Sequence, residues 1–248
     1  CISSLNAITS QLQKTLEAPF TTKFVNSNYL NTKNWEIKTF ALIMGGGHCS
    51  YWETALGTSG MLKIHHFVVR GGRYLGICAG AYFAAATSIF HLAGQNQITK
   101  TRPLAFFQGT ATGPLNTTSN HLSPNAALAI KVDLLSKKGR CYYQGGCSFD
   151  IAEDSPTTKI LARYCTPYQG SAIIACSIGA GKAVLCGLHP EFLWEESLAN
   201  HKTQQEFRTL VEKLTPQEPF RQDIWKAMIQ EFVYTHSSSR VGFFARQS

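Results

Sequence analysis

Hydrophobic residues recur at helical spacing near both ends of the chain. Four leucine and isoleucine residues, spaced three or four positions apart after a serine pair, predict an amphipathic helix over residues 3–17. Helical patterns over residues 202–214 and 220–234 are separated by a segment with two prolines. We therefore expect helices at both ends of the chain.

Short apolar runs between these ends predict strands. Residues 39–44 run into three glycines, and residues 73–77 run into an alanine-rich stretch, residues 79–88, that predicts a helix. This alternation of strand and helix is typical of a doubly wound parallel sheet with helices on both faces. A glycine-rich turn at residues 179–182 predicts a hairpin. Further strands are expected at residues 141–144, 159–164, 171–178 and 182–187.

The chain contains no internal repeat and no linker long enough to separate two domains. Its 248 residues suffice for one large domain with a substantial core. We expect an α/β domain over residues 1–200 and a helical extension over residues 201–248 that packs on the same domain.

The composition indicates a folded protein that does not span a membrane. Hydrophobic residues make up 44% and charged residues 15%, which is too apolar for disorder, and no run of 18 apolar residues occurs. None of the eight cysteines forms a CxxC pair, and several lie in apolar runs. We expect free thiols, a cytoplasmic location and no metal site.

Positive charge is concentrated in the middle of the chain. Lysine and arginine total 23 against 15 acidic residues, and residues 49–147 hold nine of the basic residues and two of the acidic ones. Such a field would favour a thiolate and attract an anionic substrate or partner surface, although solvated helix faces explain the same pattern. The excess is too moderate for a dedicated nucleic-acid binder, so we expect neither nucleic acid nor a membrane as a partner.

A cysteine lies between two glycines at the predicted junction of strand and helix. In residues 76–80, Gly-Ile-Cys-Ala-Gly, the glycines would let the backbone turn sharply and present Cys78 at the carboxyl edge of the sheet. The positive end of the following helix favours the nucleophilic thiolate. The alternative is that the glycines only allow close packing of helix and strand.

A histidine and a glutamate follow the last predicted strand. Residues two apart in an extended segment point the same way, so Glu191 can orient the imidazole of His189 while its other nitrogen faces a thiol. The alternative is a surface turn with a solvated carboxylate. The order of Cys78, His189 and Glu191 in one α/β chain favours a catalytic triad.

The three glycines at residues 45–47 end an earlier strand. Loops at the carboxyl ends of neighbouring parallel strands converge on one crevice, so the N–H groups of Gly46 and Gly47 could join that of Ala79 in stabilising an oxyanion. An ordinary turn explains the glycines equally well.

Taken together, these motifs resemble the class I glutamine amidotransferase-like family, and within it the N-terminal domain of fungal-type biotin-protein ligases. The matching stretches are residues 44–47, 71–83, 106–114, 143–146 and 184–192. The resemblance implies an α/β fold, a flavodoxin-like three-layer sandwich with a mostly parallel central sheet, a C-terminal hairpin and appended helices. It also implies a first strand before residue 1.

The resemblance assigns roles to the motif residues. It implies that Cys78 is the nucleophile and that His189 and Glu191 are its partners. No cofactor is implied. The substrate pocket is expected to include Tyr82, His48, Tyr51, Gln108 and Gly109.

Two departures from the family pattern limit the expected activity. Tyr82 stands where glutamine-hydrolysing members have a glutamine, so glutaminase activity is not expected. No ligase catalytic domain follows residue 192, so biotin transfer by this chain alone is not expected. The sequence favours a cysteine hydrolase or amidase acting on a small-molecule or peptide amide. The alternative is a catalytically inactive domain that binds a small ligand or a protein partner, with a link to the regulation of biotin-protein ligase.

Overall fold

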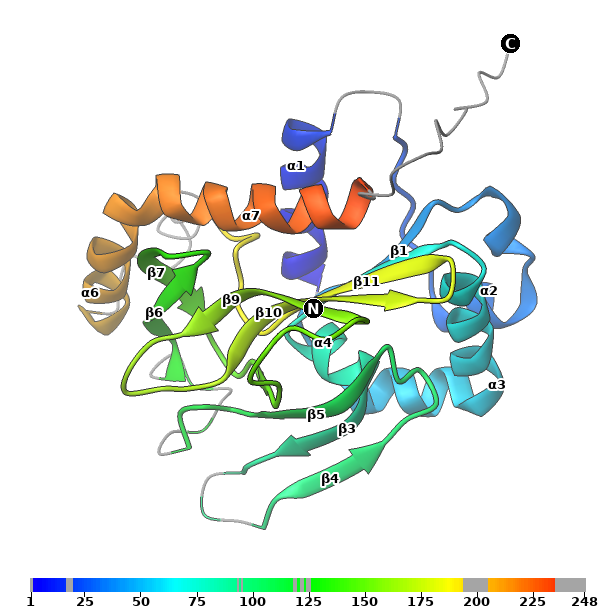
Figure 1. Ribbon diagram of the computed structural model, residues 1–248, viewed down its shortest axis with the longest axis horizontal. Helices are drawn as coiled ribbons and strands as arrows, with labels where there is room; N and C mark the ends of the chain where they lie inside the picture. Colours follow the sequence, from blue (N-terminus) through cyan, green and yellow to red (C-terminus); the bar gives the residue numbers. More distant parts are fainter. Residues whose placement is uncertain are drawn as a thin grey trace.

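The protein folds into a curled sheet with helices on both faces (Figure 1). The computed structural model describes residues 2–16, 20–92, 94, 96–117, 120, 123, 126–193 and 205–234. The helices are α1 (Ile2–Thr15), α2 (Ser27–Thr32), α3 (Cys49–Val69), α4 (Ala79–Ala84), α6 (Gln205–Leu214) and α7 (Glu218–Val233), with the 3-10 helices η1 (Trp35–Lys38) and η3 (Thr215–Gln217). The strands are β1 (Ala41–Met44), β2 (Arg73–Ile77), β3 (Ala85–Phe90), β4 (Ile98–Thr101), β5 (Phe107–Gly113), β6 (Leu128–Leu134), β7 (Lys137–Tyr143), β8 (Ser148–Phe149), β9 (Thr158–Tyr164), β10 (Ser171–Ile178) and β11 (Gly181–Cys186).

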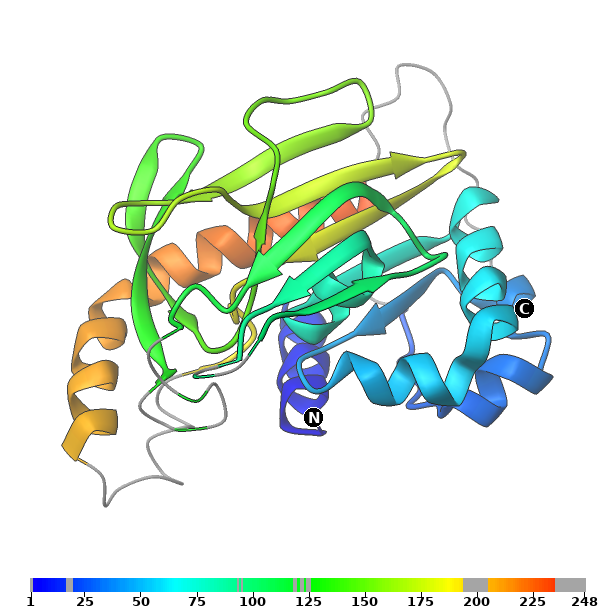
Figure 2. The same ribbon diagram turned by 90° about the horizontal axis from the view of Figure 1, so that it is seen from below.

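The strands are joined in one continuous sheet. The order is β1-β2-β11-β10-β8-β5-β3-β4, and β9, β6 and β7 extend it from β10. Strand β2 runs parallel to both neighbours, β1 and β11, and β3 runs parallel to β5. Antiparallel pairs build the rest, including β6 and β7, which lie beside α6 at one end of the molecule (Figure 2).

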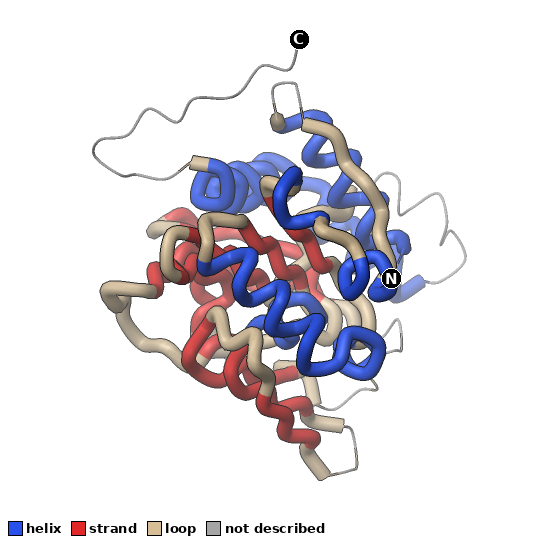
Figure 3. Tube along the Cα trace, turned by 90° about the vertical axis from the view of Figure 1, so that its right-hand side faces the viewer, coloured by secondary structure: helices blue, strands red, loops and turns tan. Residues whose placement is uncertain are grey.

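Alternating residues of the central strands face two separate cores. On β2, Tyr74 packs with the buried residues of α3, whereas Leu75 and Ile77 pack with those of α1 and α7. Burying a large apolar side chain contributes about 1.5–3 kcal/mol, so both helical layers stabilise the strands between them. Figure 3 shows the strands lying between helices in this way.

The mixed α/β architecture agrees with the sequence prediction, with differences in detail. The sheet is parallel at β1, β2 and β11, and its antiparallel part is larger than expected from the strand–helix alternation. The hairpin predicted at residues 179–182 joins β10 to β11, and Gly179 adopts a positive φ of 56° there. The flavodoxin-like three-layer sandwich stays a prediction.

The helix predicted over residues 79–88 is wrong in its second half. Helix α4 ends at Ala84, and the chain continues directly as β3, which pairs with β4 and β5. The alanines have high helix propensity, but Thr87 and Ile89 are β-branched, and the pairing partners lie far along the chain. Tertiary pairing therefore overrides local propensity here.

The C-terminal helices cover part of the sheet. Helix α7 buries one side against the core that contains Leu75, with Phe220, Trp225 and Met228 among its buried residues. In the described part of the chain, no helix is long and apolar enough to cross a bilayer.

Candidate active site

The fold brings the carboxyl ends of three parallel strands to one edge of the sheet. Met44 of β1 is paired with Gly76 of β2, and Cys186 of β11 is paired with Ile77. The segments that follow these strands are the glycine loop, the turn at Cys78 and the turn that carries His189. Ligand sites of parallel sheets lie at such an edge.

Cys78 occupies a strained turn between β2 and α4. It has φ 52° and ψ −106°, a conformation that non-glycine residues rarely adopt. Close packing enforces this turn, because a Cβ on Gly80 would lie 2.0 Å from the carbonyl oxygen of Met44. A Cβ on Gly76 would lie 2.5 Å from the carbonyl oxygen of Gly80. The chain thus turns sharply from strand into helix at Cys78, and the interpretation of this turn as a nucleophile elbow stays a prediction.

His189 and Glu191 meet through their side chains. Nδ1 of His189 lies 2.9 Å from Oε1 of Glu191, and because an ionised carboxylate only accepts, Nδ1 is the donor. Both residues are buried, and the backbone N–H of His189 donates to the carbonyl of Tyr142 at 3.0 Å. The contact between His189 and Glu191 that the spacing predicts is therefore present. It uses Nδ1, so it does not occupy Nε2, the other ring nitrogen of His189.

Electrostatics link His189 to Cys78 as well. Burial by itself would lower the pKa of His189, but the charges of Glu191 and Cys78, together with hydrogen bonds to both side chains, raise it well above its ordinary value of 6.5. The charges of Glu191 and Cys78 thus both favour the protonated imidazole. Its protonated form is the one that stabilises a thiolate.

The sequence analysis missed a fourth residue in this network, Ser4. Its Oγ donates to Oε1 of Glu191 at 2.7 Å and accepts from the N–H of Gly46 at 3.0 Å. Ser4 is only 1% exposed, in the first turn of α1. Ser4 and Glu191 are 187 residues apart in the sequence. The sequence around Ser4 indicates only a residue at the start of a helix.

The glycine loop packs against the imidazole. A Cβ on Gly46 would lie 2.9 Å from Cε1 of His189, so a side chain there would displace the ring. Because the N–H of Gly46 donates to Ser4, it is not available to an oxyanion in this arrangement. Within the described residues, no hydrogen bond occupies the N–H of Ala79 or of Gly47.

A buried arginine holds the turn between the histidine and the glutamate. Arg221 of α7 is 2% exposed, and its Nη1 donates to the carbonyl of Pro190 at 2.5 Å. Its Nε and Nη2 donate to both carboxylate oxygens of Glu218 at 2.7 and 2.6 Å. This bidentate pair fixes the guanidinium, which in turn restrains the backbone beside Glu191. The predicted C-terminal helix gave no indication of this contact.

An aromatic wall adjoins the histidine. The rings of Tyr142 and Phe192 lie 5.8 and 5.5 Å from the imidazole, measured between centroids. The thiol of Cys78, which is 8% exposed, is 3.7 Å from the carbonyl oxygen of Gln144. The nucleophile candidate therefore lies in a narrow, mostly dry environment.

Tyr82 belongs to the core rather than to an open pocket. It is 3% exposed, and its hydroxyl donates to the carbonyl of Gly146 at 2.8 Å and lies 3.2 Å from that of Gly145. The prediction that Tyr82 lines a substrate pocket needs correction, because the phenol fills the space and satisfies two backbone carbonyls.

Three of the other predicted pocket residues, Gln108, His48 and Tyr51, are exposed. Gln108 is exposed near the start of β5, beside Gly109, and its Nε2 donates to the carbonyl of Ala105 at 2.7 Å. His48 and Tyr51 are exposed at the start of α3, with ring centroids 5.7 Å apart. Their role in substrate binding stays a prediction.

The remaining cysteines differ from Cys78 in their surroundings. Burial raises the pKa of Cys141 and of Cys176 to about 12, and it raises the pKa of Cys147 and of Cys186 well above the ordinary value of 9.0. Such thiols are inert packing residues. All seven described cysteines are free thiols, and the described residues contain no group of three possible metal ligands.

The fold and these motifs define a protein family. The chain belongs to the family described as "Biotin-protein ligase, N terminal", whose sequence profile matches residues 1–241. It is 34% identical over 204 residues to a biotin–protein ligase of Schizosaccharomyces pombe, a match that covers 77% of this chain and 32% of the ligase. The matched region thus spans about a third of that relative. An uncharacterized protein of Chlamydia muridarum is 35% identical over 176 residues, covering 69% of this chain and 68% of the relative.

Solved structures with partial similarity include two glutamine amidotransferases. One is 15% identical with a TM-score of 0.49 and covers 84% of this chain and 93% of its own. The other, from Thermotoga maritima, is 14% identical with a TM-score of 0.47 and covers 79% of each chain.

Proposed function

We propose that this protein is a cysteine-nucleophile hydrolase or amidase of the class I glutamine amidotransferase-like type. The observation that carries the proposal is the buried imidazole of His189, whose Nδ1 is hydrogen-bonded to Glu191 and whose pKa is raised by the charges of Glu191 and Cys78. An elbow cysteine, a base and a group that orients the base are the parts that covalent acyl transfer requires.

The first half of the reaction forms a thioester. Nε2 of His189 holds the thiol proton, and Sγ of Cys78 attacks the carbonyl carbon of an amide as the thiolate while the carbonyl electron pair moves to oxygen. The N–H groups of Ala79 and Gly47 are proposed to receive this oxyanion. The C–N bond then breaks, and His189 returns the proton to the departing amine.

The second half regenerates the thiol. His189 removes a proton from a water molecule that attacks the thioester carbonyl, and the tetrahedral adduct collapses to a carboxylic acid. The C–S bond breaks, and Cys78 recovers its proton from His189. No oxidant, metal ion or cofactor enters this cycle.

Glu191 and Ser4 act as positioning residues in this scheme. Glu191 holds the Nδ1 proton of His189, and Ser4 fixes one rotamer of Glu191 by donating to the same oxygen that the histidine uses. Preorganised contacts of this kind lower the cost of bringing the reacting groups together.

The substrate class is a small-molecule or peptide amide other than free glutamine. Tyr82 fills the position that the family uses for its glutamine pocket, and its hydroxyl is bonded to backbone carbonyls. The site therefore favours a substrate that approaches from the side of His189 and its aromatic neighbours.

A second candidate function is a catalytically inactive domain that binds a small ligand or a protein partner. Two observations favour it: Cys78 is only 8% exposed, and Tyr82 is buried with its hydroxyl bonded to the carbonyl of Gly146. The match to part of a biotin–protein ligase suggests a link between such binding and the regulation of that enzyme.

Intact-mass spectrometry separates the two candidates. The protein is incubated with a panel of small-molecule and peptide amides and thioesters, alongside Cys78→Ala and His189→Gln. A hydrolase forms an acyl adduct on Cys78 that is absent from Cys78→Ala and slow in His189→Gln. Saturable binding without an adduct from any member of the panel would instead support the inactive domain.

A further inference from the structure

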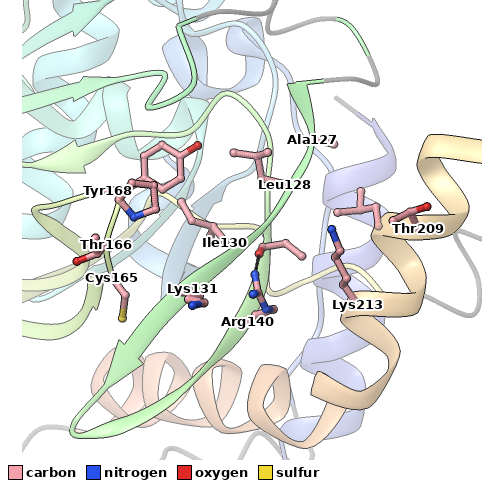
Figure 4. A pocket seen from close by; sticks show the side chains of 13 residues that line it. Ala127, Leu128, Ile130, Lys131, Arg140, Cys165, Thr166, Tyr168, Thr209 and Lys213 are labelled. Atoms are coloured by element: carbon pink, nitrogen blue, oxygen red, sulfur yellow. Dashed lines mark hydrogen bonds between the residues drawn. The ribbon is translucent and has the colours of Figure 1, made fainter.

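A second cavity lies at the end of the sheet that α6 covers. It has a volume of about 390 Å³ and is formed by β6 and β7, by the turn after β9 and by one side of α6 (Figure 4). Its lining comprises Ala127, Leu128, Ala129, Ile130, Lys131, Arg140, Cys165, Thr166, Pro167, Tyr168, Thr209, Leu210 and Lys213. The candidate active site contributes none of these residues.

Three positive side chains converge on this cavity. Lys131 of β6 and Arg140 of β7 are directly paired across the two strands, so both point to the same face of the sheet. Lys213 approaches the same space from α6 (Figure 4). Like charges in direct cross-strand register are destabilising, and a third cation adds to the repulsion.

The lining offers these cations no carboxylate. Asp133 is the nearest acidic residue along β6, but its Oδ1 accepts from the N–H of Ser136 at 2.7 Å. In register, Asp133 lies opposite Lys138 on one side and Arg163 on the other. The cross-strand pair of Asp133 and Lys138 thus combines opposite charges, whereas the pair of Lys131 and Arg140 in the cavity combines two positive charges.

The surroundings of the cations leave room for an anion. Within the described residues, neither Lys131 nor Lys213 forms an ion pair. Arg140 uses Nη1 to donate to the carbonyl of Ala129 at 2.7 Å, which holds the guanidinium beside the cavity. The other guanidinium donors have no partner among the described residues, and the backbone N–H of Arg140 donates to Oε1 of Gln217 at 3.0 Å.

Apolar side chains form the rest of the wall. On the face of the sheet that Lys131 and Arg140 share, Leu210 of α6 is buried and packs with Ala127 and Ala129. Ile130 points to the opposite face, into the core that contains Leu75. A cavity with a charged rim and an apolar wall suits a ligand that has both characters.

We propose that this cavity binds a small organic anion, with a carboxylate or phosphate head against Lys131, Arg140 and Lys213 and an apolar body against Ala129 and Leu210. Binding would offset the repulsion between the paired cations and bury apolar surface of the ligand. The inference is independent of the chemistry proposed for Cys78.

Calorimetric titration of the full chain tests this assignment. The probes are hexanoate, hexyl phosphate, inorganic phosphate and hexanamide, the last being a neutral match for hexanoate. The variant Lys131→Gln/Lys213→Gln removes two exposed cations that have no structural partner, and Lys226→Gln, an exposed lysine of α7, is the matched control. The far-UV circular dichroism spectrum verifies that each variant is folded.

The expected result is saturable binding of hexanoate or hexyl phosphate that weakens about tenfold in the double variant and is unchanged in Lys226→Gln. Preference for one of the two probes identifies the head group. The inference is overturned if neither alkyl anion binds, if hexanamide binds as tightly, if inorganic phosphate binds as tightly, or if the double variant binds like the wild type.

Discussion

Oγ of Ser4 donates a hydrogen bond of 2.7 Å to Oε1 of Glu191, which joins the first turn of the chain to the last residue of the candidate triad. The same oxygen of Glu191 accepts from His189, and the hydroxyl of Ser4 also accepts from Gly46. One serine therefore connects the glycine loop, the carboxylate and, through it, the imidazole. This connection makes α1 part of the site.

Replacing Ser4 by alanine tests this role. Loss of the hydroxyl leaves Glu191 free to rotate and the N–H of Gly46 without its acceptor, so iodoacetamide should label Cys78 about three- to tenfold more slowly. The free energy of unfolding in urea should fall by about 1–2 kcal/mol. Ser10→Ala, in the same helix, is the control and should change neither quantity appreciably. Unchanged labelling in folded Ser4→Ala would show that the contact is structural only.

The part of the site that could be predicted from the sequence is the part that depends on local geometry. The elbow at Cys78 follows from two glycines at fixed offsets, and the contact between His189 and Glu191 follows from the alternation of an extended chain. Strand β2 has the predicted bounds because a fully buried parallel strand is a continuous apolar run.

The parts that could not be predicted depend on long-range contacts. Nothing in the neighbourhood of Ser4 or Arg221 indicates that these residues reach the turn at Pro190, since both contacts form only when distant helices pack on the sheet. The strand Ala85–Phe90 could not be predicted for the same reason. Its alanine-rich sequence favours a helix, and pairing with β5 stabilises the strand instead. The burial of Tyr82 likewise depends on carbonyls more than 60 residues away.

A methyl group at Gly46 should disturb the imidazole. A Cβ there would lie 2.9 Å from Cε1 of His189, and displacing the ring should slow labelling of Cys78 about tenfold to a hundredfold. The control is Gly57→Ala, since a Cβ at Gly57 meets nothing within 4 Å although its φ of 62° is strained. That control should lose about 1–2 kcal/mol of stability and keep its labelling rate. Peptide-resolved mass spectrometry measures both rates, and equal rates in the two variants would contradict the placement of the loop against His189.

The raised pKa of His189 predicts a pH-dependent stability. Because the folded pKa lies above the ordinary value, the stabilisation is fully present below about pH 6.5 and is lost as the pH rises through the folded pKa. The difference in unfolding free energy between the wild type and His189→Gln should therefore shrink as the pH rises. Urea titrations between about pH 6 and 8 measure this difference. His66→Gln, an exposed histidine, should show no such trend, and a difference that grows with pH would contradict the assignment.

Tyr82→Phe tests whether this residue is structural. Removing the hydroxyl takes this donor from the carbonyls of Gly145 and Gly146, of which Gly146 keeps the hydroxyl of Tyr143 at 2.8 Å, so the free energy of unfolding should fall by about 1 kcal/mol. Labelling of Cys78 should change less than twofold, because the ring still fills its place. Unchanged stability of Tyr82→Phe together with strongly altered labelling of Cys78 would instead show that Tyr82 takes part in the reactive site.

The central claim is that His189 activates Cys78, and the rate of alkylation of each cysteine tests it most directly. Iodoacetamide labelling at pH 7, resolved by peptide, compares Cys78 with Cys49 and Cys165, which are more exposed. We expect Cys78 to react at least about tenfold faster than either, despite its lower exposure, and to lose this advantage in His189→Gln while the other two keep their rates. A Cys78 that reacts no faster than Cys49 and Cys165, or equally fast without His189, would contradict the account.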